Sequence, residues 1–440
     1  MSLFGAMNSA ISGLAAQSNA FGNISDNVAN SQTVGFKRVD TRFVDYLTVS
    51  TQFANEPGAV VARPEYVNNV QGTISQSSSP LNMAIAGQGF FAVSQQTGQV
   101  NGRPTFNAQQ FYTRAGDFSL NKDGFMVNSS GQFLNGWAID PTTGLANQNA
   151  LSPIQVSQSA YNPVATTQVA LAANLPATPA AGTATAASPI SSDISVYDAL
   201  GTAHTVTLNW TQNAGNDWTV SVNAHDAATP AVGSADVQFG PIASGNPVPA
   251  GTIGQIGAAT GSVSSAGYGA GTAASLSMVM DFGSGPQTID LGLGTYGGAT
   301  GVTQYSGTAF NLQGLTQNGV PPGSFTGVTT QANGDVVVNF DNGQVRAIGQ
   351  VALITFNNPN GLQRQNGQSF TATLISGTPR IDAVNNNGAG SLVTSSTETS
   401  NVDIASEFSQ LIVAQRAYSA NTKVVTTAED MLQQTIDMKR

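Results

Sequence analysis

The chain has 440 residues, which at roughly 150 residues per domain suggests about three domains. It contains 14 Lys and Arg against 24 Asp and Glu, so the net charge is −10, and only 9% of residues are charged. This acidic balance argues against a nucleic-acid partner. The absence of Cys excludes disulfides, thiol nucleophiles and zinc–thiolate sites.

The N-terminal region lacks the features of membrane and secretory segments. No run of roughly 18 or more apolar residues occurs, so we expect no membrane-spanning helix. The first 36 residues carry one charged side chain, Asp26, so the basic region of a Sec-type signal peptide is missing. This pattern fits either a cytosolic protein or one that is exported without a cleavable signal peptide, and composition does not distinguish the two.

Apolar residues at spacings of three and four predict a long helix over residues 2–30 and a second one, of about 38 residues, at the C-terminal end. Ser400-Asn401-Val402-Asp403 is interpreted as the capping box of the second helix, and Lys439-Arg440 suits the negative end of its dipole. The stripe residues are Phe4, Met7, Ile11, Leu14 and Phe21 in the first helix, and Ile404, Phe408, Leu411, Tyr418, Val425, Leu432 and Ile436 in the second.

Such a stripe commonly packs on the core of its own domain. Here both stripes lie at the ends of the chain, beside β-rich segments that have apolar faces of their own. An isolated helix with one apolar stripe gains little beyond its local propensity, so a partner must bury it. We therefore favour coiled-coil packing between copies of the chain.

Strands separated by turns lie between the predicted helices and the centre of the chain. Residues 87–93 are predicted to be a strand, and residues 111–125 to contain a hairpin around Lys122-Asp123-Gly124. Residues 336–343 and 351–356 are the counterparts on the return of the chain. If the first and last segments pair, each inner domain is inserted into the one before it. We therefore predict a mainly β fold, with nested antiparallel β-domains inserted between N- and C-terminal coiled-coil helices.

The segment from Asp123 to the residue before Arg346 contains no Lys, Arg or Glu and is rich in Gly, Ala, Ser and Thr. Its short apolar alternations, such as residues 204–210 and 218–222, are separated by Gly, Asn and Asp turns. This pattern predicts an antiparallel sandwich or barrel. The low-complexity run from Pro176 to Pro189 is predicted to be a surface loop or linker.

The chemical motifs in the sequence are incomplete. Gly87-Gln88-Gly89 lacks the third glycine of a dinucleotide loop, and residues 119–130 lack the first and last acids of a calcium loop. His204 and His225 have no second ligand nearby in the sequence, so we expect satisfied or exposed side chains. We therefore predict no catalytic, cofactor-binding or metal-binding residue.

Several short motifs occur together and in a characteristic order. They are Ser12-Gly13-Leu14-Ala15-Ala16-Gln17, residues 27–37, Gly89-Phe90-Phe91, Thr113-Arg114-Ala115-Gly116, residues 400–408 and residues 411–421. In this order they resemble the signatures of the bacterial flagellar axial family, which comprises the rod, hook and hook-associated proteins.

Length favours a hook member within this family. A short rod protein has no room for residues 162–306, where hook members carry an inserted outer β-domain, and residues 197–204 resemble a motif of that insert. Two features depart from the family pattern. The outer segment is unusually poor in cations, and Thr397-Glu398-Thr399 precedes Ser400-Asn401-Val402-Asp403, where we would expect a segment that begins with an acidic residue.

The resemblance implies a structural subunit, not an enzyme and without a cofactor, that polymerises into a curved hollow tube acting as a universal joint between rod and filament. It implies self-assembly, contacts with the hook cap, distal rod and hook–filament junction proteins, and type III flagellar export to the outside of the cell. A distal-rod protein, or a secreted β-rich adhesin or glycan-binding protein, is the alternative. The expected parts are a terminal helical domain (1–30 and 401–440), a linker region (31–71 and 391–400), an inner β-domain (72–161 and 307–390) and an outer β-domain (162–306).

Overall fold

The computed structural model describes residues 3–50, 55–140, 143–177, 184–185, 188–242, 247–265, 267–269, 271–307 and 309–438. The chain forms two compact units, which are described separately. Unit 1 comprises Met1–Gln158, Thr326–Asn339 and Val345–Arg440, and unit 2 comprises Ser159–Phe325 and Phe340–Gln344. The prediction of a mainly β fold with nested antiparallel domains between terminal helices is confirmed.

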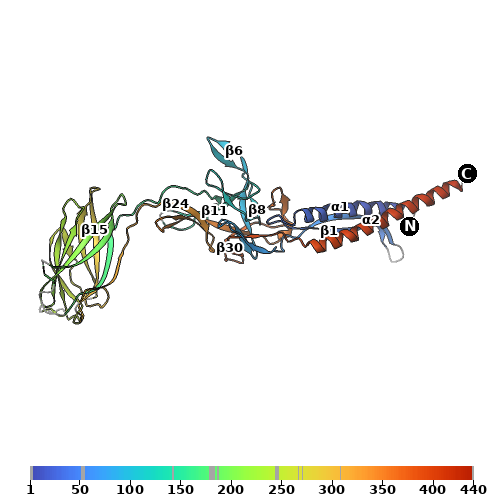
Figure 1. The fold of residues 1–440 in the computed structure, drawn as a ribbon. Helices are drawn as coiled ribbons and strands as arrows, with labels where there is room; N and C mark the ends of the chain where they lie inside the picture. Colours follow the sequence, from blue (N-terminus) through green and yellow to red (C-terminus); the bar gives the residue numbers. More distant parts are fainter. Residues whose placement is uncertain are drawn as a thin grey trace. The chain divides into compact units, whose positions relative to one another are not determined.

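Two antiparallel helices, α1 (Leu3–Ala29) and α2 (Ile404–Asp437), pair within unit 1. Asn27, near the end of α1, donates a hydrogen bond to Glu407 at the start of α2, whereas Leu3 lies beside Met431 near the end of α2. Figure 1 shows the helices side by side, with the C-terminal end of α2 extending past the start of α1. Each helix therefore has a partner within its own chain, which the sequence analysis did not anticipate.

The N-terminal cap of α2 differs from the prediction. Asp403 is the capping residue, and its carboxylate accepts hydrogen bonds from the backbone N–H groups of Ala405 and Ser406. Ser400 is not the cap because the chain remains extended as far as Asp403. The predicted closing pair, Lys439-Arg440, lies outside the described residues.

A long hairpin follows α1 in the range that we expected to be part of a linker. Strands β1 (Val39–Ser50) and β2 (Asn55–Tyr66) pair antiparallel, and the hairpin lies along α1. The hydroxyl of Ser12 in α1 accepts a hydrogen bond from the Val60 N–H, and Asn23 donates to the Thr41 hydroxyl. The linker assignment missed this hairpin because its mixed polar and apolar sequence packs against α1, a contact that the local sequence does not indicate.

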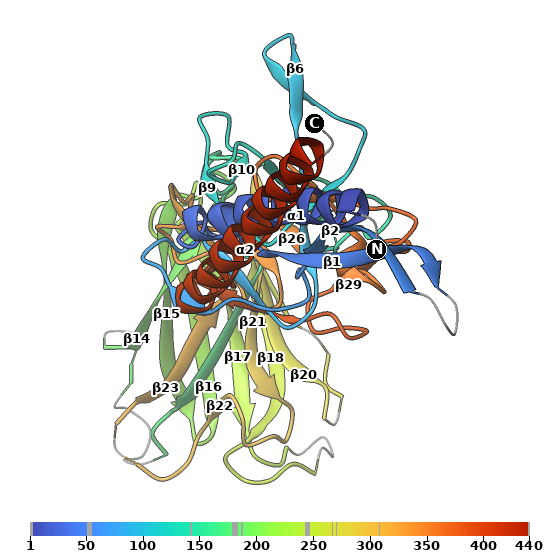
Figure 2. The same ribbon diagram turned by 90° about the vertical axis from the view of Figure 1, so that its right-hand side faces the viewer.

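The remainder of unit 1 is a β-domain built on one branched sheet, whose main path runs β24-β25-β26-β11-β5-β8-β28-β27. The predicted hairpin around Lys122-Asp123-Gly124 is present, because β9 pairs with β10. A separate hairpin, β6–β7, projects from the sheet (Figure 2). The bounds are β5 (Phe90–Ser94), β6 (Gln96–Val100), β7 (Arg103–Phe106), β8 (Phe111–Thr113), β9 (Ser119–Leu120), β10 (Met126–Val127), β11 (Phe133–Ala138), β12 (Ser152–Pro153), β24 (Phe325–Thr330), β25 (Asp335–Phe340), β26 (Val345–Thr355), the short 3-10 helix η1 (Pro359–Gly361), β27 (Gln363–Gln365), β28 (Ser369–Thr371) and β29 (Arg380–Ala383).

Strands from the two ends of the chain pair directly beside this sheet. Strand β3 (Ile74–Gln76) pairs with β31 (Ser396–Glu398), and β4 (Met83–Ala86) pairs with β30 (Ser391–Thr394). Both pairs are antiparallel. The outgoing and returning segments therefore run together, as the nested organisation requires.

Unit 2 is a sandwich of two sheets around one apolar core that contains the buried Trp210 and Trp218. The first sheet runs β14-β15-β16-β17-β18, and the second runs β19-β20-β21-β13-β22 with β23 also paired to β13. The bounds are β13 (Gln168–Asn174), β14 (Ile190–Tyr197), β15 (Ala203–Ala214), β16 (Asp217–Ala224), β17 (Ala231–Phe239), β18 (Ile253–Gly261), β19 (Val263–Ser265), β20 (Ala273–Asp281), β21 (Pro286–Thr295), β22 (Val302–Thr303) and β23 (Asn311–Gln317).

The antiparallel prediction for this segment has one exception. Strand β13 pairs parallel with β21 and β22 over short stretches, and antiparallel with β23. These pairings place β13, the first strand of the unit, beside β23, the last one. Most of the run from Pro176 to Pro189 lies outside the described residues.

Candidate subunit-packing surface

The buried face of each terminal helix consists mostly of small side chains. Small residues allow neighbouring backbones to approach closely, and a Cβ atom added at Gly13 would lie only 2.8 Å from the Asn421 amide nitrogen. Because small residues occupy the contact between the helices, many of the large apolar side chains lie on the other faces of α1 and α2 and are half-buried or exposed. The buried small residues are Ala10, Ala16 and Ala20 of α1, and Ala414 and Ala428 of α2.

The predicted stripe residues divide into two groups. The half-buried group is Met7, Leu14, Phe21, Leu411, Val425 and Leu432. The exposed group is Phe4, Ile11, Ile404, Phe408, Tyr418 and Ile436. Phe21 and Tyr418 belong to different groups but meet across the helix pair, with ring centroids 6.2 Å apart. Burial within the chain thus accounts for part of the stripe only, and packing between subunits stays a prediction.

Further exposed apolar side chains lie on α2 beyond the predicted stripe, and the sequence reasoning missed them. They fall outside a single row of three and four spacings. Runs of adjacent apolar residues in the sequence, such as Leu411-Ile412-Val413, were the available signal of a wider apolar arc. The additional residues are Ile412, Val413, Val424 and Met431, with Met438 at the C-terminal cap of the helix.

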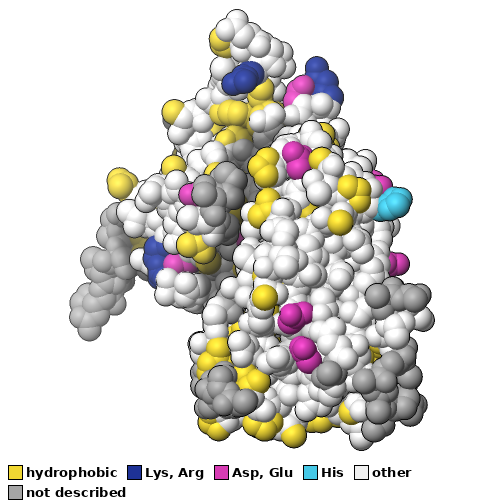
Figure 3. All heavy atoms as spheres, turned by 90° about the vertical axis from the view of Figure 1, so that its left-hand side faces the viewer, with side chains coloured by type: hydrophobic (Ala, Val, Ile, Leu, Met, Phe, Trp, Pro, Cys, Tyr) yellow, Lys and Arg dark blue, Asp and Glu magenta, His cyan; other side chains and the backbone are white. Residues whose placement is uncertain are grey.

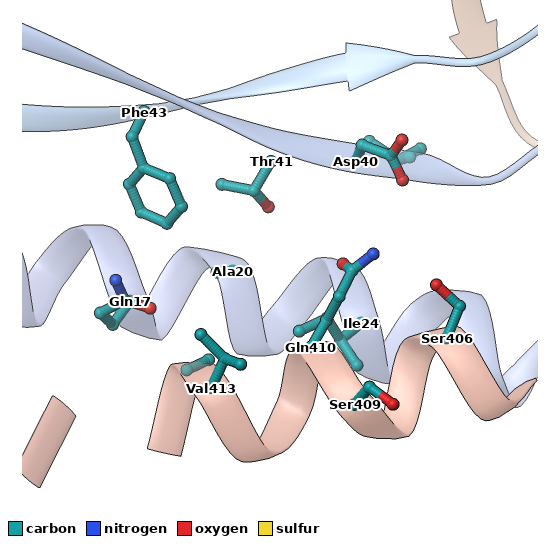
Figure 4. A pocket seen from close by; sticks show the side chains of 12 residues that line it. Gln17, Ala20, Ile24, Asp40, Thr41, Phe43, Ser406, Ser409, Gln410 and Val413 are labelled. Atoms are coloured by element: carbon teal, nitrogen blue, oxygen red, sulfur yellow. The ribbon is translucent and has the colours of Figure 1, made fainter. Parts of the chain in front are cut away.

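A groove of about 330 Å³ runs between α1, α2 and β1 (Figure 4). Its apolar lining includes Ala20, Ile24 and Phe43, with Val413 at its edge on α2. Among the twelve residues that line it, Asp40 is the charged one. We call this feature the helix–hairpin groove.

A buried ion cluster joins three distant segments of unit 1. Glu398, which is fully buried, accepts hydrogen bonds through Oε1 from Lys37 Nζ and from the Gly72 N–H, and through Oε2 from Arg114 Nη1 at 3.0 Å. Lys37 Nζ also donates to the Val70 carbonyl at 2.7 Å. Burial lowers the pKa of Lys37, and the nearby Arg114 lowers it further, whereas Glu398 opposes both effects.

Arg114 completes the cluster by anchoring the β-domain. Its guanidinium donates to the carbonyls of Ile85 and Gly87 as well as to Glu398, and it lies 5.3 Å from the centroid of the Phe90 ring. Burial lowers its pKa, and Glu398 again opposes the shift. The cluster contains two cations and one carboxylate, so its stability depends on Glu398.

A glycine permits the close approach of backbones beside this cluster. Gly35 has φ of +70°, and a Cβ atom there would lie 2.3 Å from the Ala115 nitrogen. The Gly35 N–H donates to the carbonyl of Glu398 at 2.8 Å. The motif containing Lys37 and the motif containing Arg114 therefore meet at the segment containing Glu398.

A second buried carboxylate, Glu407, lies where α1, α2 and β1 meet. Its Oε1 accepts from Asn27, which also exchanges two hydrogen bonds with the Val39 backbone, while Oε2 has no hydrogen-bond partner. Burial raises the pKa of Glu407; the charge of Asp40 adds to this effect, and the hydrogen bond from Asn27 opposes it.

The two histidines lie in unit 2. His204 is stacked on Phe282, with centroids 4.1 Å apart, and its Nε2 lies 3.5 Å from Asp198 Oδ2, whereas His225 is exposed. Within the described residues, no three His, Asp or Glu side chains are grouped so as to hold a metal ion. The same residues include no helix that is long and apolar enough to cross a membrane.

Few charges interrupt the surface. Figure 3 shows one face of the molecule, on which acidic side chains and fewer Lys and Arg are scattered among mostly uncharged ones. Unit 1 ends in a helix pair that leaves apolar side chains exposed, and both units are otherwise β-rich, a combination that fits a structural protein better than an enzyme.

Comparisons with known proteins agree with this class. Four family profiles match: the flagella basal body rod protein family (residues 7–37), the flagellar hook protein FlgE/F/G D1 domain (84–172), the flagellar basal body protein FlaE D2 domain (165–320) and the C-terminal family of flagellar basal body rod FlgEFG proteins (393–438).

Full-length relatives extend these matches. The flagellar hook protein FlgE of Brucella suis is 31% identical over 100% of both chains, and that of Salmonella typhimurium is 27% identical over 98% of this chain and 99% of the relative. A crystal structure of Helicobacter pylori flagellar hook protein FlgE2 aligns with 74% of this chain and 99% of that chain, at 14% identity and a TM-score of 0.48. The chain belongs to the flagellar hook protein family and is a structural subunit of the hook, not an enzyme. The distal-rod and adhesin alternatives are not favoured.

Proposed function

We propose that the subunits polymerise through the apolar side chains that α1 and α2 leave exposed, and that these helices form the inner wall of a hollow tube. The observation that carries the proposal is the exposed row on both helices, including Phe4, Phe408 and Ile436, which remains after the helices have paired within the chain. Burying such side chains between copies is strongly favourable. The predicted packing stripe is Phe4, Met7, Ile11, Leu14, Phe21, Ile404, Phe408, Leu411, Tyr418, Val425, Leu432 and Ile436. Its exposed members, through which we propose that copies make contact, are Phe4, Ile11, Ile404, Phe408, Tyr418 and Ile436.

The composition of unit 2 supports a role as a sliding outer shell. In a curved rotating tube, each row of subunits must lengthen and shorten once per turn. Unit 2 contains no Lys, Arg or Glu, so neighbouring copies of unit 2 cannot be held in one register by Lys or Arg ion pairs with one another. Weak, interchangeable contacts suit a universal joint between rod and filament.

The division of the chain follows the same scheme. Residues 1–30 and 401–440 would line the tube, residues 31–71 and 391–400 would connect them to an inner β-domain of residues 72–161 and 307–390, and residues 162–306 would form the outer shell. Nesting of the first and last segments, through pairs such as β3–β31 and β4–β30, supports this arrangement.

As a flagellar component, the subunit would reach its site by the type III flagellar export apparatus, without a cleavable signal peptide, and assemble outside the cell. Its other partners would be the hook cap, the distal rod and the hook–filament junction proteins. Flagellar relatives over the full length of the chain support this placement.

The test is a single charge placed on the proposed packing surface, at the seam where two subunits would meet. Phe408 is 51% exposed, so Phe408→Asp should leave the monomer folded. A carboxylate buried at a seam costs about 3 kcal/mol or more, which should raise the critical concentration for polymerisation about 100-fold. Sedimentation and electron microscopy of the purified chain measure this effect.

The control is Gln415→Asp, which places the same charge at an exposed polar position of the same helix. It should polymerise like the parent. Tubes of normal length from Phe408→Asp at the parent concentration would show that this stripe is not a seam.

A further inference from the structure

The chain is rich in Asn-Gly pairs, at which an asparagine side chain can be attacked by its own backbone. The glycine has no Cβ atom, so its backbone nitrogen approaches the side-chain carbonyl carbon of the asparagine without hindrance. The chain therefore offers several candidate sites of spontaneous deamidation, and their surroundings in the fold determine which of them can react. Eight asparagines precede a glycine, and all lie in the described residues: Asn101, Asn135, Asn318, Asn333, Asn342, Asn360, Asn366 and Asn387.

Four of these pairs are held by two sets of hydrogen bonds. Asn333 Nδ2 donates to Asp335 Oδ2 at 2.7 Å, and the N–H of the following Gly334 donates to the Gln331 carbonyl at 3.0 Å. Both the side chain that must be attacked and the nitrogen that must attack are therefore occupied. The same double hold occurs at Asn318, Asn342 and Asn360.

Two further pairs are held through the side chain. Asn135 is 2% exposed within β11 and donates to the Ser94 hydroxyl at 2.7 Å. Asn387 Nδ2 donates to Asp382 Oδ1 at 2.8 Å. Six of the eight asparagines must therefore break a hydrogen bond before they can react.

Asn101 and Asn366 remain, and their surroundings differ. The Asn366 carbonyl accepts from the Ser369 hydroxyl at 2.9 Å, and a Cβ atom at Gly367 would lie 2.9 Å from the Ser130 Cβ, so this turn is closely packed. At Asn101, neither the side chain nor the Gly102 N–H forms a hydrogen bond with a described residue. A Cβ atom at Gly102 would have no neighbour within 4 Å, so the pair lies in open space.

The hairpin that carries Asn101 can also open locally. Asn101 and Gly102 form the turn between β6 and β7, with φ of +52° and +76°, and this hairpin projects from the sheet (Figure 2). Every residue of β6 is exposed. Opening an exposed tip costs little free energy, so the Asn101 backbone can rotate out of the turn to the geometry that ring closure needs.

We propose that Asn101 is a site of spontaneous deamidation. The Gly102 nitrogen gives up its proton and attacks the side-chain carbonyl carbon of Asn101. The new C–N bond closes a succinimide ring, and the bond to the side-chain nitrogen breaks, so this nitrogen leaves with the proton as ammonia. Water then hydrolyses one of the ring carbonyls and gives aspartate or isoaspartate. Water is the co-reactant, and no electrons are transferred.

The two products affect the hairpin differently. Both add a negative charge beside the exposed Arg103. Aspartate accepts the left-handed conformation about as well as asparagine does. Isoaspartate carries its Cβ atom in the backbone, so it no longer fits a two-residue turn in which both residues have positive φ. The site lies outside the proposed packing surface, and the inference goes beyond the proposed function.

The test compares the pairs within one folded chain. The purified full chain is incubated at mildly alkaline pH and digested with chymotrypsin, which cuts after Phe91 and Phe106 and releases a peptide whose one asparagine is Asn101. Mass spectrometry follows conversion, and isoaspartyl methyltransferase labels the isoaspartate. Asn101 should convert at least about tenfold faster than Asn333, because local opening and two hydrogen bonds separate them. It should also convert faster than Asn366.

Two controls separate the effect of the fold from that of the sequence. In denaturant, Asn101 and Asn333 should convert at comparable rates, because both precede glycine. In the folded chain, Asp382→Ala releases Asn387, whose glycine also lies in open space, and should raise the rate at Asn387 at least about threefold without changing the rate at Asn101.

Three results would overturn the assignment. The first is conversion of folded Asn101 no faster than that of Asn333 or Asn366. The second is an equal difference between Asn101 and Asn333 in denaturant, which would place the cause in the local sequence. The third is an unchanged rate at Asn387 in Asp382→Ala, which would show that side-chain hydrogen bonds do not select the reactive pair.

Discussion

Glu398 is the single residue at which three separate segments of unit 1 meet. Its carboxylate is shared by Lys37, Arg114 and the Gly72 N–H, and all three partners come from different parts of the chain. The surrounding cluster is buried, so water cannot replace a lost partner. This carboxylate therefore couples the folding of the two chain ends to that of the β-domain.

The first prediction concerns Glu398→Gln. The amide can still accept from Gly72, but Lys37 and Arg114 become two buried cations without a counter-charge, so unit 1 should lose about 3–5 kcal/mol of unfolding free energy. Urea denaturation followed by Trp137 fluorescence, with Trp210 and Trp218 replaced by Phe, measures unit 1 alone.

Asp26→Asn is the matched control, because Asp26 forms a half-exposed pair with Arg364. It should cost at most about 1 kcal/mol. Equal effects of the two substitutions would mean that the buried cluster contributes no more than a surface pair.

A second prediction at the residue scale concerns pH. Burial, supported by the charge of Asp40, raises the pKa of Glu407 in the folded chain, although Asn27 and Arg38 oppose the shift. The folded state then holds the proton more tightly than the unfolded state. The stability from this group is fully present below the unfolded pKa, about 4.3, and is lost as the pH rises through the folded pKa.

Glu407→Gln cannot ionise, so its unfolding free energy should fall less than that of the parent as the pH rises from 4 to 7. Denaturant titrations at a series of pH values measure this difference. Glu65→Gln, at an exposed position of β2, is the control and should follow the parent. A pH dependence of Glu407→Gln that matches the parent would show that Glu407 contributes none of it.

At the scale of elements, small residues determine how α1 and α2 pair. Ala414 is buried on α2 beside the helix–hairpin groove, whereas Ala420 on the same helix is exposed. Ala414→Leu should force the helix away from its neighbours and cost about 1–3 kcal/mol. Ala420→Leu should change stability by less than about 0.5 kcal/mol.

Thermal unfolding followed by circular dichroism at 222 nm measures this helix-packing effect. If Ala414→Leu is as stable as the parent, the helix pair is loose enough to accommodate a larger side chain. The close-packed arrangement would then not be what keeps the large apolar residues outside.

At the scale of the whole molecule, the chain leaves and re-enters unit 2 through adjacent residues. The Tyr161 N–H donates to the Gly323 carbonyl at 2.8 Å, and Val164 is bridged to Val320 in the same antiparallel manner. Because these ends lie together, residues 162–322 can be replaced by a short Gly-Ser linker without stretching the remaining chain.

This deletion should shift the thermal midpoint of unit 1 by less than about 4 °C, which corresponds to about 1 kcal/mol. The shortened chain should still form tubes, but straight ones, because we propose that unit 2 forms the outer shell, where it would have the greatest leverage over curvature. Electron microscopy decides the outcome. Tubes of unchanged curvature would place the curvature determinant in unit 1, and a folded chain that forms no tubes would make unit 2 part of the tube wall.

Local patterns were sufficient for several elements of this fold. The three and four spacing of apolar residues located both terminal helices, and Lys122-Asp123-Gly124 located a hairpin. The β1–β2 hairpin was not predicted, because its residues do not show a clear alternation of polar and apolar side chains and the hairpin packs against α1, which is a tertiary contact. Glu398 was noticed only as a departure from an expected motif, since nothing nearby in the sequence indicates that Lys37 and Arg114 converge on it.

The sequence by itself determined the mainly β class, the nested order of segments and the flagellar resemblance, because periodicity and turn residues are local properties that follow the chain. Only the tertiary structure decided which stripe residues remain exposed, since burial depends on the small residues that bring α1 and α2 together. It also decided that one carboxylate serves two distant cations. Such contacts join residues hundreds of positions apart, and their energy depends on geometry that local sequence does not encode.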